Sequence, residues 1–270
     1  MSKRSEQARL LVVGNVTEDL GFQVPHLPQP GETLICDARS SDLGGKGLNQ
    51  AVIAARCGVA VSLLAPVGRD SVADRARALV ESENLDANLV DIIDRTDQSV
   101  ISVSNSGENT IISSALAADS LDPSRGSASV AGFGAGDSLL VQGNLSMETT
   151  RAVLTAAHEH GVITYANPSP IRWDWKTMFS LVDTAVVNRL ELATLSGVDS
   201  VDAGIAALRA AGCSRVLVTL GAEGAILADE RGSRVQPAIQ TTVVDTAGAG
   251  DTFCGVFVAR EILGDTTQCA

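Results

Sequence analysis

Short apolar runs alternate along the chain with longer segments whose apolar residues recur at helical spacing. Residues 10–14 and 138–142 are apolar without alternation, which is typical of strands buried on both faces of a parallel sheet. Residues 70–83 keep their apolar side chains on one side of a helix. The same pattern predicts further strands at residues 61–65, 89–93, 162–166, 184–187, 215–220 and 225–228, and further helices at residues 49–57, 147–160 and 201–211. This alternation predicts an α/β fold with a doubly wound, mostly parallel sheet flanked by helices.

Two segments do not fit this alternation. Residues 21–42 contain several helix-breaking prolines and a glycine, and residues 32–40 have the composition of short exposed strands. Residues 99–114 are typical of a hairpin, with apolar runs on either side of a glycine-containing loop at residues 105–109. On pattern alone they are either a pair of surface hairpins or parts of one small β element.

Composition narrows the classes of protein to which the chain can belong. Its 270 residues suffice for one large α/β domain or two modest ones. The formal net charge of −12 at pH 7 argues against a nucleic-acid or anionic-membrane surface, although backbone N–H groups can still bind a nucleotide, and no apolar run is long enough to span a bilayer. Five cysteines without paired spacing predict reduced thiols and a cytoplasmic location, and residues 1–9 lack the apolar segment of a secretory signal.

The strongest candidate for chemistry lies at residues 245–251, with the sequence Asp-Thr-Ala-Gly-Ala-Gly-Asp. A β-rich run at residues 241–244 precedes it, and an apolar helix is predicted after it. Strand, glycine-rich turn and helix start in this order form an anion site, because the first-turn N–H groups are free and the helix dipole favours negative charge. Asp251 would repel a resting phosphate, but it could take a proton from a hydroxyl while the N–H groups stabilise a transferred phosphoryl group. The alternative is a capped helix after a tight turn.

A second candidate lies at residues 44–51, with the sequence Gly-Gly-Lys-Gly-Leu-Asn-Gln-Ala. Its glycines allow the backbone to approach a ligand closely, and Lys46 and Asn49 lie on one face of the predicted helix. Asp19 follows the first strand, at the edge where open α/β sheets bind ligands. The alternatives are a surface lysine in a flexible loop and a turn or helix-cap aspartate.

Together the two motifs resemble those of the ribokinase-like (PfkB) carbohydrate kinases, in the same order and at a similar separation. The resemblance runs from about residue 10 to about residue 257. It implies a single ribokinase-like domain over residues 1–270, with a small β lid from about residues 21–42 and 99–114 and a homodimer through that lid. It also implies ATP-dependent phosphorylation of a sugar hydroxyl, with sugar and ATP as ligands and Mg²⁺ as cofactor.

The resemblance also assigns roles to individual residues. It implies a catalytic base at Asp251, and phosphoryl-stabilising N–H groups at Gly248, Ala249 and Gly250. It implies sugar binding by Thr17, Asp19, Gly45, Lys46, Gly47, Asn49 and Asn144. It implies nucleotide binding by Asn188, Thr219, Gly221, Gly224 and Gly250, and ordering of Mg²⁺ through water by Glu191. Asp245 and the Ala247 carbonyl match the first half of a monovalent-cation site. Without the resemblance, Asn188 and Glu191 would be a capped surface helix, and residues 219–224 a plain hairpin.

The chain departs from the family pattern at three points. Thr17 stands where the family's ribose-specific members have asparagine. Asn144 stands where they have glutamate, and an amide does not offer a hydroxyl the same charged acceptor, so the substrate stays open between a sugar, a nucleoside and another small polyol. The chain also ends soon after the 245–251 motif, so we expect the family's C-terminal helices and the second half of the cation loop to be absent. This leaves K⁺ activation open, and it makes a non-catalytic sugar or nucleotide binder the alternative to an active kinase.

Overall fold

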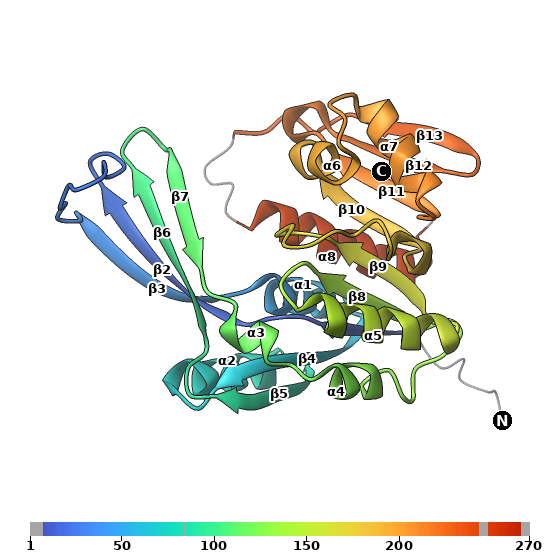
Figure 1. The fold of residues 1–270 in the computed structure, drawn as a ribbon, viewed down its shortest axis with the longest axis horizontal. Coiled ribbons are helices and arrows are strands. Elements are labelled where there is room, and N and C mark those ends of the chain that lie inside the picture. Colours follow the sequence, from blue (N-terminus) through green and yellow to red (C-terminus); the bar gives the residue numbers. More distant parts are fainter. Residues whose placement is uncertain (1–7, 84, 243–247, 266–270) are drawn as a thin grey trace.

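A nine-stranded sheet forms the centre of the molecule, with the strand order β13-β12-β11-β10-β9-β8-β1-β4-β5 (Figure 1). The computed structural model describes residues 8–83, 85–242 and 248–265. The strands are β1 (Arg9–Val13), β4 (Ala60–Gly68), β5 (Asp86–Ile93), β8 (Ser138–Gln142), β9 (Ile163–Asn167), β10 (Thr184–Asn188), β11 (Arg215–Thr219), β12 (Ala225–Asp229) and β13 (Gly232–Gln236). They pair in parallel from β5 through to β11, and β12 and β13 are antiparallel at one edge. The chain leaves β1 first toward β4 and later toward β8, so the strand order reverses at β1, where open α/β sheets bind ligands.

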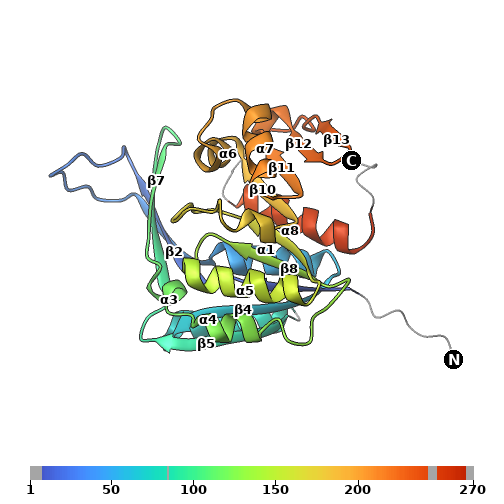
Figure 2. The same ribbon diagram turned by 45° about the vertical axis from the view of Figure 1, so that its right-hand side comes forward.

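Helices cover both faces of the sheet because its central strands are apolar on both sides. One face is covered by α1 (Lys46–Arg56), α2 (Ser71–Ser82) and α8 (Ala249–Ile262). The other is covered by α3 (Leu116–Asp119), α4 (Pro123–Ala128), α5 (Met147–Glu159), η1 (Phe179–Leu181), α6 (Arg189–Ser196) and α7 (Val201–Ala210) (Figures 1 and 2). Leu10 and Val12 of β1 are buried on the first face, and Leu11 and Val13 on the second. The predicted doubly wound α/β fold is confirmed. In the described part of the chain, none of the helices combines the length and apolar character that a membrane span requires.

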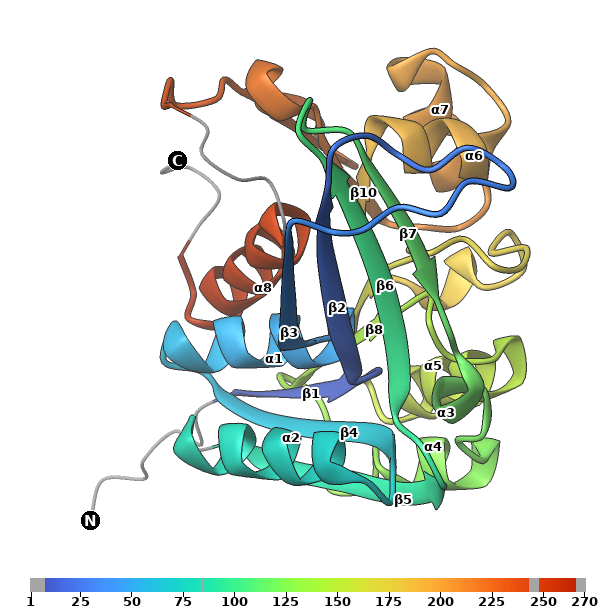
Figure 3. The ribbon, with the colours of Figure 1, turned by 90° about the vertical axis from the view of Figure 1, so that its left-hand side faces the viewer.

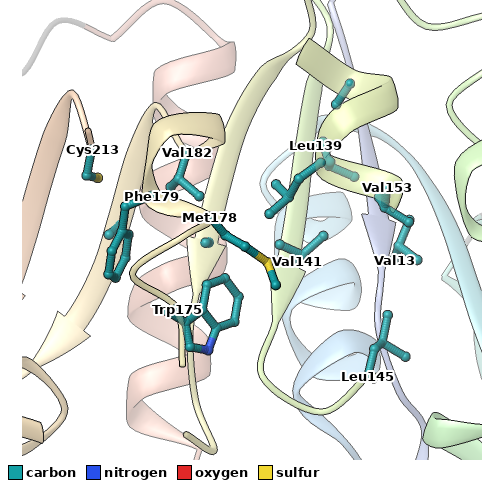
Figure 4. Close-up of a cluster of buried hydrophobic side chains, with 14 of the residues drawn as sticks. Val13, Leu139, Val141, Leu145, Val153, Trp175, Met178, Phe179, Val182 and Cys213 are labelled. Carbon is teal, nitrogen blue, oxygen red and sulfur yellow. The ribbon is translucent and has the colours of Figure 1, made fainter. Parts of the chain in front are cut away.

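Large side chains from the β9–β10 connection fill the second face (Figure 4). Trp175, Met178 and Phe179 are at most 1% exposed, and the Trp175 ring stacks on Trp173 with centroids 4.2 Å apart. Burial of each such side chain stabilises the fold by about 1.5–3 kcal/mol. This packing holds the irregular connection against the sheet.

A smaller four-stranded sheet with the order β3-β2-β6-β7 projects from the main body (Figures 1 and 3). Its strands are β2 (Thr17–Val24), β3 (Ala38–Gly44), β6 (Asp97–Ser104) and β7 (Asn109–Ser113). The predicted hairpin within residues 99–114 is present, but the first segment differs from the predicted 21–42. Strand β2 begins at Thr17, and residues 32–37 are not a strand. The prolines that follow β2 explain why this strand ends at Val24, because proline has no N–H group to continue a ladder.

Helix α2 ties this small sheet to the main body through one arginine. The Arg75 guanidinium donates to Glu18 Oε1 at 3.1 Å and to Ser41 Oγ and O, both at 3.2 Å. Gln98 donates to the other Glu18 oxygen at 2.7 Å. Hydrogen bonds from Ser41 and Gln98, with the charge of Arg75, hold the pKa of the Glu18 carboxyl below its usual range. Strands β2, β3 and β6 are thus joined to α2 around one carboxylate.

Helices α1 and α8, which come from opposite ends of the chain, pack closely at Gly255. A Cβ atom at this position would lie 2.9 Å from Ile53 Cγ2 and 3.0 Å from the Gln50 carbonyl oxygen. Such distances are too short for a side chain, so the absence of a Cβ allows the close approach of the two helices.

We predict that Gly255→Ala is less stable than Gly250→Ala by about 1–3 kcal/mol in free energy of unfolding, because only the first overpacks the α1–α8 contact. Gly250 is the matched control, since it lies in the same helix with no atom within 4 Å of an added Cβ. Both substitutions replace a glycine of α8 by alanine, and alanine favours a helix, so the packing cost at Gly255 opposes this gain in only one of them. Urea denaturation measures both, and equal stabilities would contradict the close packing.

Candidate active site

The N-terminus of α1 lies directly against the loop that follows β1. Gly47 N–H donates to Asn15 Oδ1 at 3.3 Å, and Leu48 N–H donates to the Asn15 carbonyl at 3.1 Å. A Cβ at Gly45 would lie 2.8 Å from the Asn15 carbonyl oxygen, and one at Gly47 would lie 2.5 Å from Asn15 N. Both glycines are therefore required for this approach. Since the Gly47 N–H group already donates to Asn15, Gly47 does not offer a free donor to a ligand. Its role is to let α1 approach the loop after β1 closely.

Asp251 lies in the first turn of α8 and is only 7% exposed. Its Oδ1 accepts hydrogen bonds from Lys46 Nζ at 3.2 Å and from Gln50 Nε2 at 2.9 Å, and its Oδ2 accepts one from Asn49 Nδ2 at 3.3 Å. All these donors lie in the first turns of α1. The structure thus brings together Asp251, Lys46 and Asn49, which the sequence placed in two motifs far apart along the chain. The arrangement presents a carboxylate, and a carboxylate can act as the acceptor of a proton.

A buried chain of amide groups continues from Asp251 into the molecule. Gln50 Nε2 also donates to Asn167 Oδ1 at 3.2 Å, and Gln142 Nε2 donates to Gln50 Oε1 at 2.8 Å. The sequence pattern predicts no role for Gln50, Gln142 or Asn167. The available signals were the position of Gln50 inside the second motif, the position of Gln142 at the end of a predicted strand and the position of Asn167 directly after another.

Among the described residues, nothing crowds the first turn of α8. Gly248 is its N-cap, with φ of 69°, and no described side chain caps the turn. In the same part of the chain, no atom lies within 4 Å of a Cβ added at Gly248 or Gly250. The described hydrogen bonds of the Asp251 carboxylate come from α1, and a helix start of this kind can accept an anion at its first-turn N–H groups.

Asp19 and Thr17 begin the small sheet beside this site. Thr17 Oγ1 donates to Asp19 Oδ1 at 2.8 Å. A Cβ at Gly44 would lie 2.0 Å from Asp19 Oδ2, so the carboxylate lies against the backbone just before α1.

Asn144 follows β8, and its Oδ1 is buried with no partner among the described residues. In the same part of the chain, no hydrogen bond joins Asn144 to Asp19 or Asp251.

The predicted nucleotide residues form a separate group at the ends of β10 and β11. Asn188 and Thr219, the last residues of these strands, are cross-strand neighbours. Asn188 caps α6 by accepting from Glu191 N–H at 2.8 Å, and Glu191 Oε2 accepts from Asn188 N–H at 2.9 Å. This capping box is what a capped surface helix would also show, so the geometry alone assigns these residues no further role.

The turn after β11 contains η2 (Gly221–Glu223) and requires its glycines. Gly221 and Gly224 have φ of 61° and 101°, and a Cβ at Gly224 would lie 1.9 Å from the Gln236 carbonyl oxygen. Arg189 of α6 pairs with Glu223 at 2.6 Å, which joins this turn to the start of α6.

Asp245 and Ala247, the predicted monovalent-cation residues, lie outside the described residues. Within the described ranges, no group of three or more His, Cys, Asp or Glu side chains could hold a metal ion.

Cys254 lies one helical turn after Asp251 and is fully buried. Burial, followed by the nearby Asp251 carboxylate, raises the pKa of the Cys254 thiol to about 12. The thiol therefore stays protonated near neutral pH and is a poor nucleophile. The first turns of α8 thus offer the Asp251 carboxylate, and not the Cys254 thiol, as a base.

Comparison with known proteins agrees with this arrangement. The family model for pfkB family carbohydrate kinases matches residues 7–266. A ribokinase from Haemophilus influenzae is 31% identical over 256 residues, which cover 92% of this chain and 84% of the relative. A deoxyribokinase from Salmonella typhi is 30% identical over 269 residues, which cover 97% of this chain and 88% of the relative. The structure of a ribokinase from Cryptococcus neoformans in complex with ADP matches with a TM-score of 0.84 at 29% identity, over 98% of this chain and 90% of that one.

These matches extend over nearly the whole chain, in sequence and in fold, and they indicate a phosphotransferase that acts on a carbohydrate. The chain therefore belongs to the pfkB family of carbohydrate kinases.

Proposed function

We propose that this protein transfers the γ-phosphoryl group of ATP to a hydroxyl group of a sugar, with Asp251 as the base that takes the hydroxyl proton. The observation that carries the proposal is a mostly buried carboxylate beside a helix N-terminus that no described side chain caps or crowds. The N–H groups of Gly248, Ala249 and Gly250 stabilise the negative charge on the phosphoryl group during transfer. The sugar oxygen attacks the γ-phosphorus, and the bond between that phosphorus and the oxygen of ADP breaks. The proton of the sugar hydroxyl passes to Asp251.

The sugar is held on the β1 and β8 side of the site. Asp19, Lys46 and Asn49 offer an acceptor, a cation and an amide, and Thr17 fixes one Asp19 oxygen. Gly45 and Gly47 let the backbone approach the ligand, and Asn144 contributes a buried amide oxygen without a protein partner among the described residues. The small sheet serves as a lid that excludes water from the reaction.

The nucleotide binds on the β10 and β11 side, where Asn188, Thr219, Gly221 and Gly224 line one edge of the sheet. Mg²⁺, bound with ATP, would supply positive charge that neutralises the charge of the phosphates. Glu191 fits a water-mediated contact to such an ion, because only its Oε2 is engaged by the Asn188 N–H in the described structure. The described cysteines are free thiols, which supports a reducing, cytoplasmic location.

A pentose or 2-deoxypentose is the substrate class that we propose. A ribokinase and a deoxyribokinase match this chain at similar identity. Asn144 offers a neutral amide where a carboxylate would bind a hydroxyl more strongly, which supports tolerance of a sugar that lacks one hydroxyl.

Asp251→Asn should bind sugar and ATP normally but turn over about 10²–10⁴-fold more slowly, because the acceptor of the hydroxyl proton is lost. Calorimetry measures the binding of each ligand, and a coupled assay of ADP release measures turnover. Asp199→Asn is the control, because Asp199 is exposed and remote from the α1–α8 contact.

Wild-type turnover in Asp251→Asn would rule out this base. Binding of both ligands by the unaltered chain without any ADP release would instead favour the non-catalytic binder.

Asp19→Asn should raise the KM for ribose or 2-deoxyribose by about 10–100-fold, since a hydrogen bond to a charged group contributes about 1.5–3 kcal/mol. The KM for ATP should stay within about threefold of wild type, because Asp19 lies on the sugar side of the site. Steady-state kinetics with each substrate varied in turn checks the split. An unchanged sugar KM, with the exposed Asp37→Asn as control, would remove Asp19 from the sugar site.

We also propose that the small sheet forms a homodimer contact. Val100 and Ile112 are cross-strand partners that are 39% and 71% exposed. By the strand alternation they lie on the face opposite Asp19, so they can be covered without blocking the sugar site. An exposed apolar pair of this kind is typical of an interaction surface.

Ile112→Asp should shift the protein from dimer to monomer in sedimentation velocity, because an unpaired carboxylate in a buried contact is unfavourable. Val235→Asp is the matched control, since Val235 is 63% exposed on the edge strand of the other sheet. A dimer that persists in Ile112→Asp, or a monomeric parent protein, would contradict the contact.

A further inference from the structure

Three amide side chains lie fully inside the molecule beneath Asp251. Gln50 and Gln142 are 0% exposed, and Asn167 is 7% exposed. Buried amides are costly unless their hydrogen bonds are made, so their presence in the interior requires a compensating role. They link the α1 helix, the ends of β8 and β9, and Asp251 of α8.

The direction of this hydrogen-bond chain is fixed by a backbone group. Asn167 Nδ2 donates to the Val186 carbonyl at 2.9 Å, and a carbonyl can only accept. The oxygen of Asn167 must therefore face Gln50, which makes the Gln50 nitrogen a donor toward Asn167 and Asp251.

The remaining oxygen of Gln50 also has a partner, since it accepts from Gln142 Nε2 at 2.8 Å. Gly14 leaves the room for Gln142, because a Cβ there would lie 2.2 Å from Gln142 Oε1. That oxygen of Gln142 is buried without a hydrogen-bond partner among the described residues, so Gln142 follows the orientation of Gln50 and does not set it. A flipped Gln50 amide would turn its oxygen toward the oxygens of Asn167 and Asp251, so these two residues set its orientation.

Gln50 differs in this respect from the other donors to Asp251. The Lys46 side chain is 28% exposed, and a long cationic side chain at such a place is screened and free to turn toward a ligand. Gln50 is enclosed and makes the shortest of the contacts to Asp251, at 2.9 Å. It can hold the carboxylate while Lys46 and Asn49 exchange partners with the substrate.

We propose that Gln50 is a positioning residue for phosphoryl transfer, which orients Asp251 through an amide whose direction is fixed by Asn167. The inference rests on the proposed function, because it takes Asp251 as the base. Gln50 itself does not contact the substrate and acts only through the Asp251 carboxylate.

Gln50→Met keeps the length of the side chain but removes both donors. We expect kcat to fall about 10–100-fold, the value of a hydrogen bond to a charged group, with the KM for sugar and ATP within about threefold of wild type. Gln142→Met is the matched control, because it is equally buried but leaves the Gln50 contact with Asp251 in place, and its kcat should fall less than about fivefold. Wild-type kcat in folded Gln50→Met would overturn the proposal, as would an equal fall in both variants.

Combining Gln50→Met with Asp251→Asn separates positioning from a general structural defect. If Gln50 acts through Asp251, adding Gln50→Met to Asp251→Asn should lower kcat little further, whereas a structural defect would multiply the two losses. Wild-type turnover in Asp251→Asn alone would refute the base itself. Loss of turnover in that variant with wild-type kcat in Gln50→Met would refute only the positioning role.

A spectroscopic measurement keeps the proposal testable if Gln50→Met does not fold or turnover is absent. The side-chain amide protons of Gln50, assigned by their absence in Gln50→Glu, should shift in Asp251→Asn, because their charged acceptor becomes neutral. Amide resonances of Gln50 that are unchanged in Asp251→Asn would overturn the proposal.

Discussion

The contact on which the site depends is the one between the carboxylate of Asp251 and the first turns of α1. The two helices come from opposite ends of the chain, yet they cover the same face of the sheet and approach closely at Gly255. This approach brings Lys46, Asn49 and Gln50 to one carboxylate that is almost removed from solvent. A buried carboxylate without hydrogen-bond partners would be strongly unfavourable, so the donors of α1 offset the cost of placing this side chain at such depth.

The sheet orders the rest of the proposed site along one edge. β1 and β8 end beside α1 and the small sheet, and β10 and β11 end beside the turn that contains η2. The amide chain under Asp251 contacts the end of β8, in the first group, and the end of β9, which lies between the two groups. We therefore propose that the sugar and the nucleotide approach from opposite sides and meet above Asp251. The reversal of strand order at β1 explains why this edge is open.

The sequence predicted the sheet and the helices because buried strands and amphipathic helices have strong periodic signals. That two distant motifs belong to one site was implied by their resemblance to those of the PfkB family. It missed α3, which is a single turn, and β13, whose side chains are all exposed and therefore carry no apolar pattern. It placed the first lid segment too late, since the polar start of β2 at Thr17 was taken for the end of β1. It also gave no role to Gln50, Gln142 and Asn167, because a hydrogen-bond chain that joins three elements depends on tertiary packing, which no local pattern encodes.

The central claim is that Asp251 accepts the proton of the sugar hydroxyl at the start of α8. A crystal structure with the sugar and a non-hydrolysable ATP analogue tests this claim most directly. The account predicts the acceptor hydroxyl within about 2.6–3.2 Å of an Asp251 carboxylate oxygen, with the γ-phosphate against the N–H groups of Gly248 to Gly250. A ternary complex in which the hydroxyl lies beyond hydrogen-bond reach of Asp251, with another side chain in its place, would contradict it.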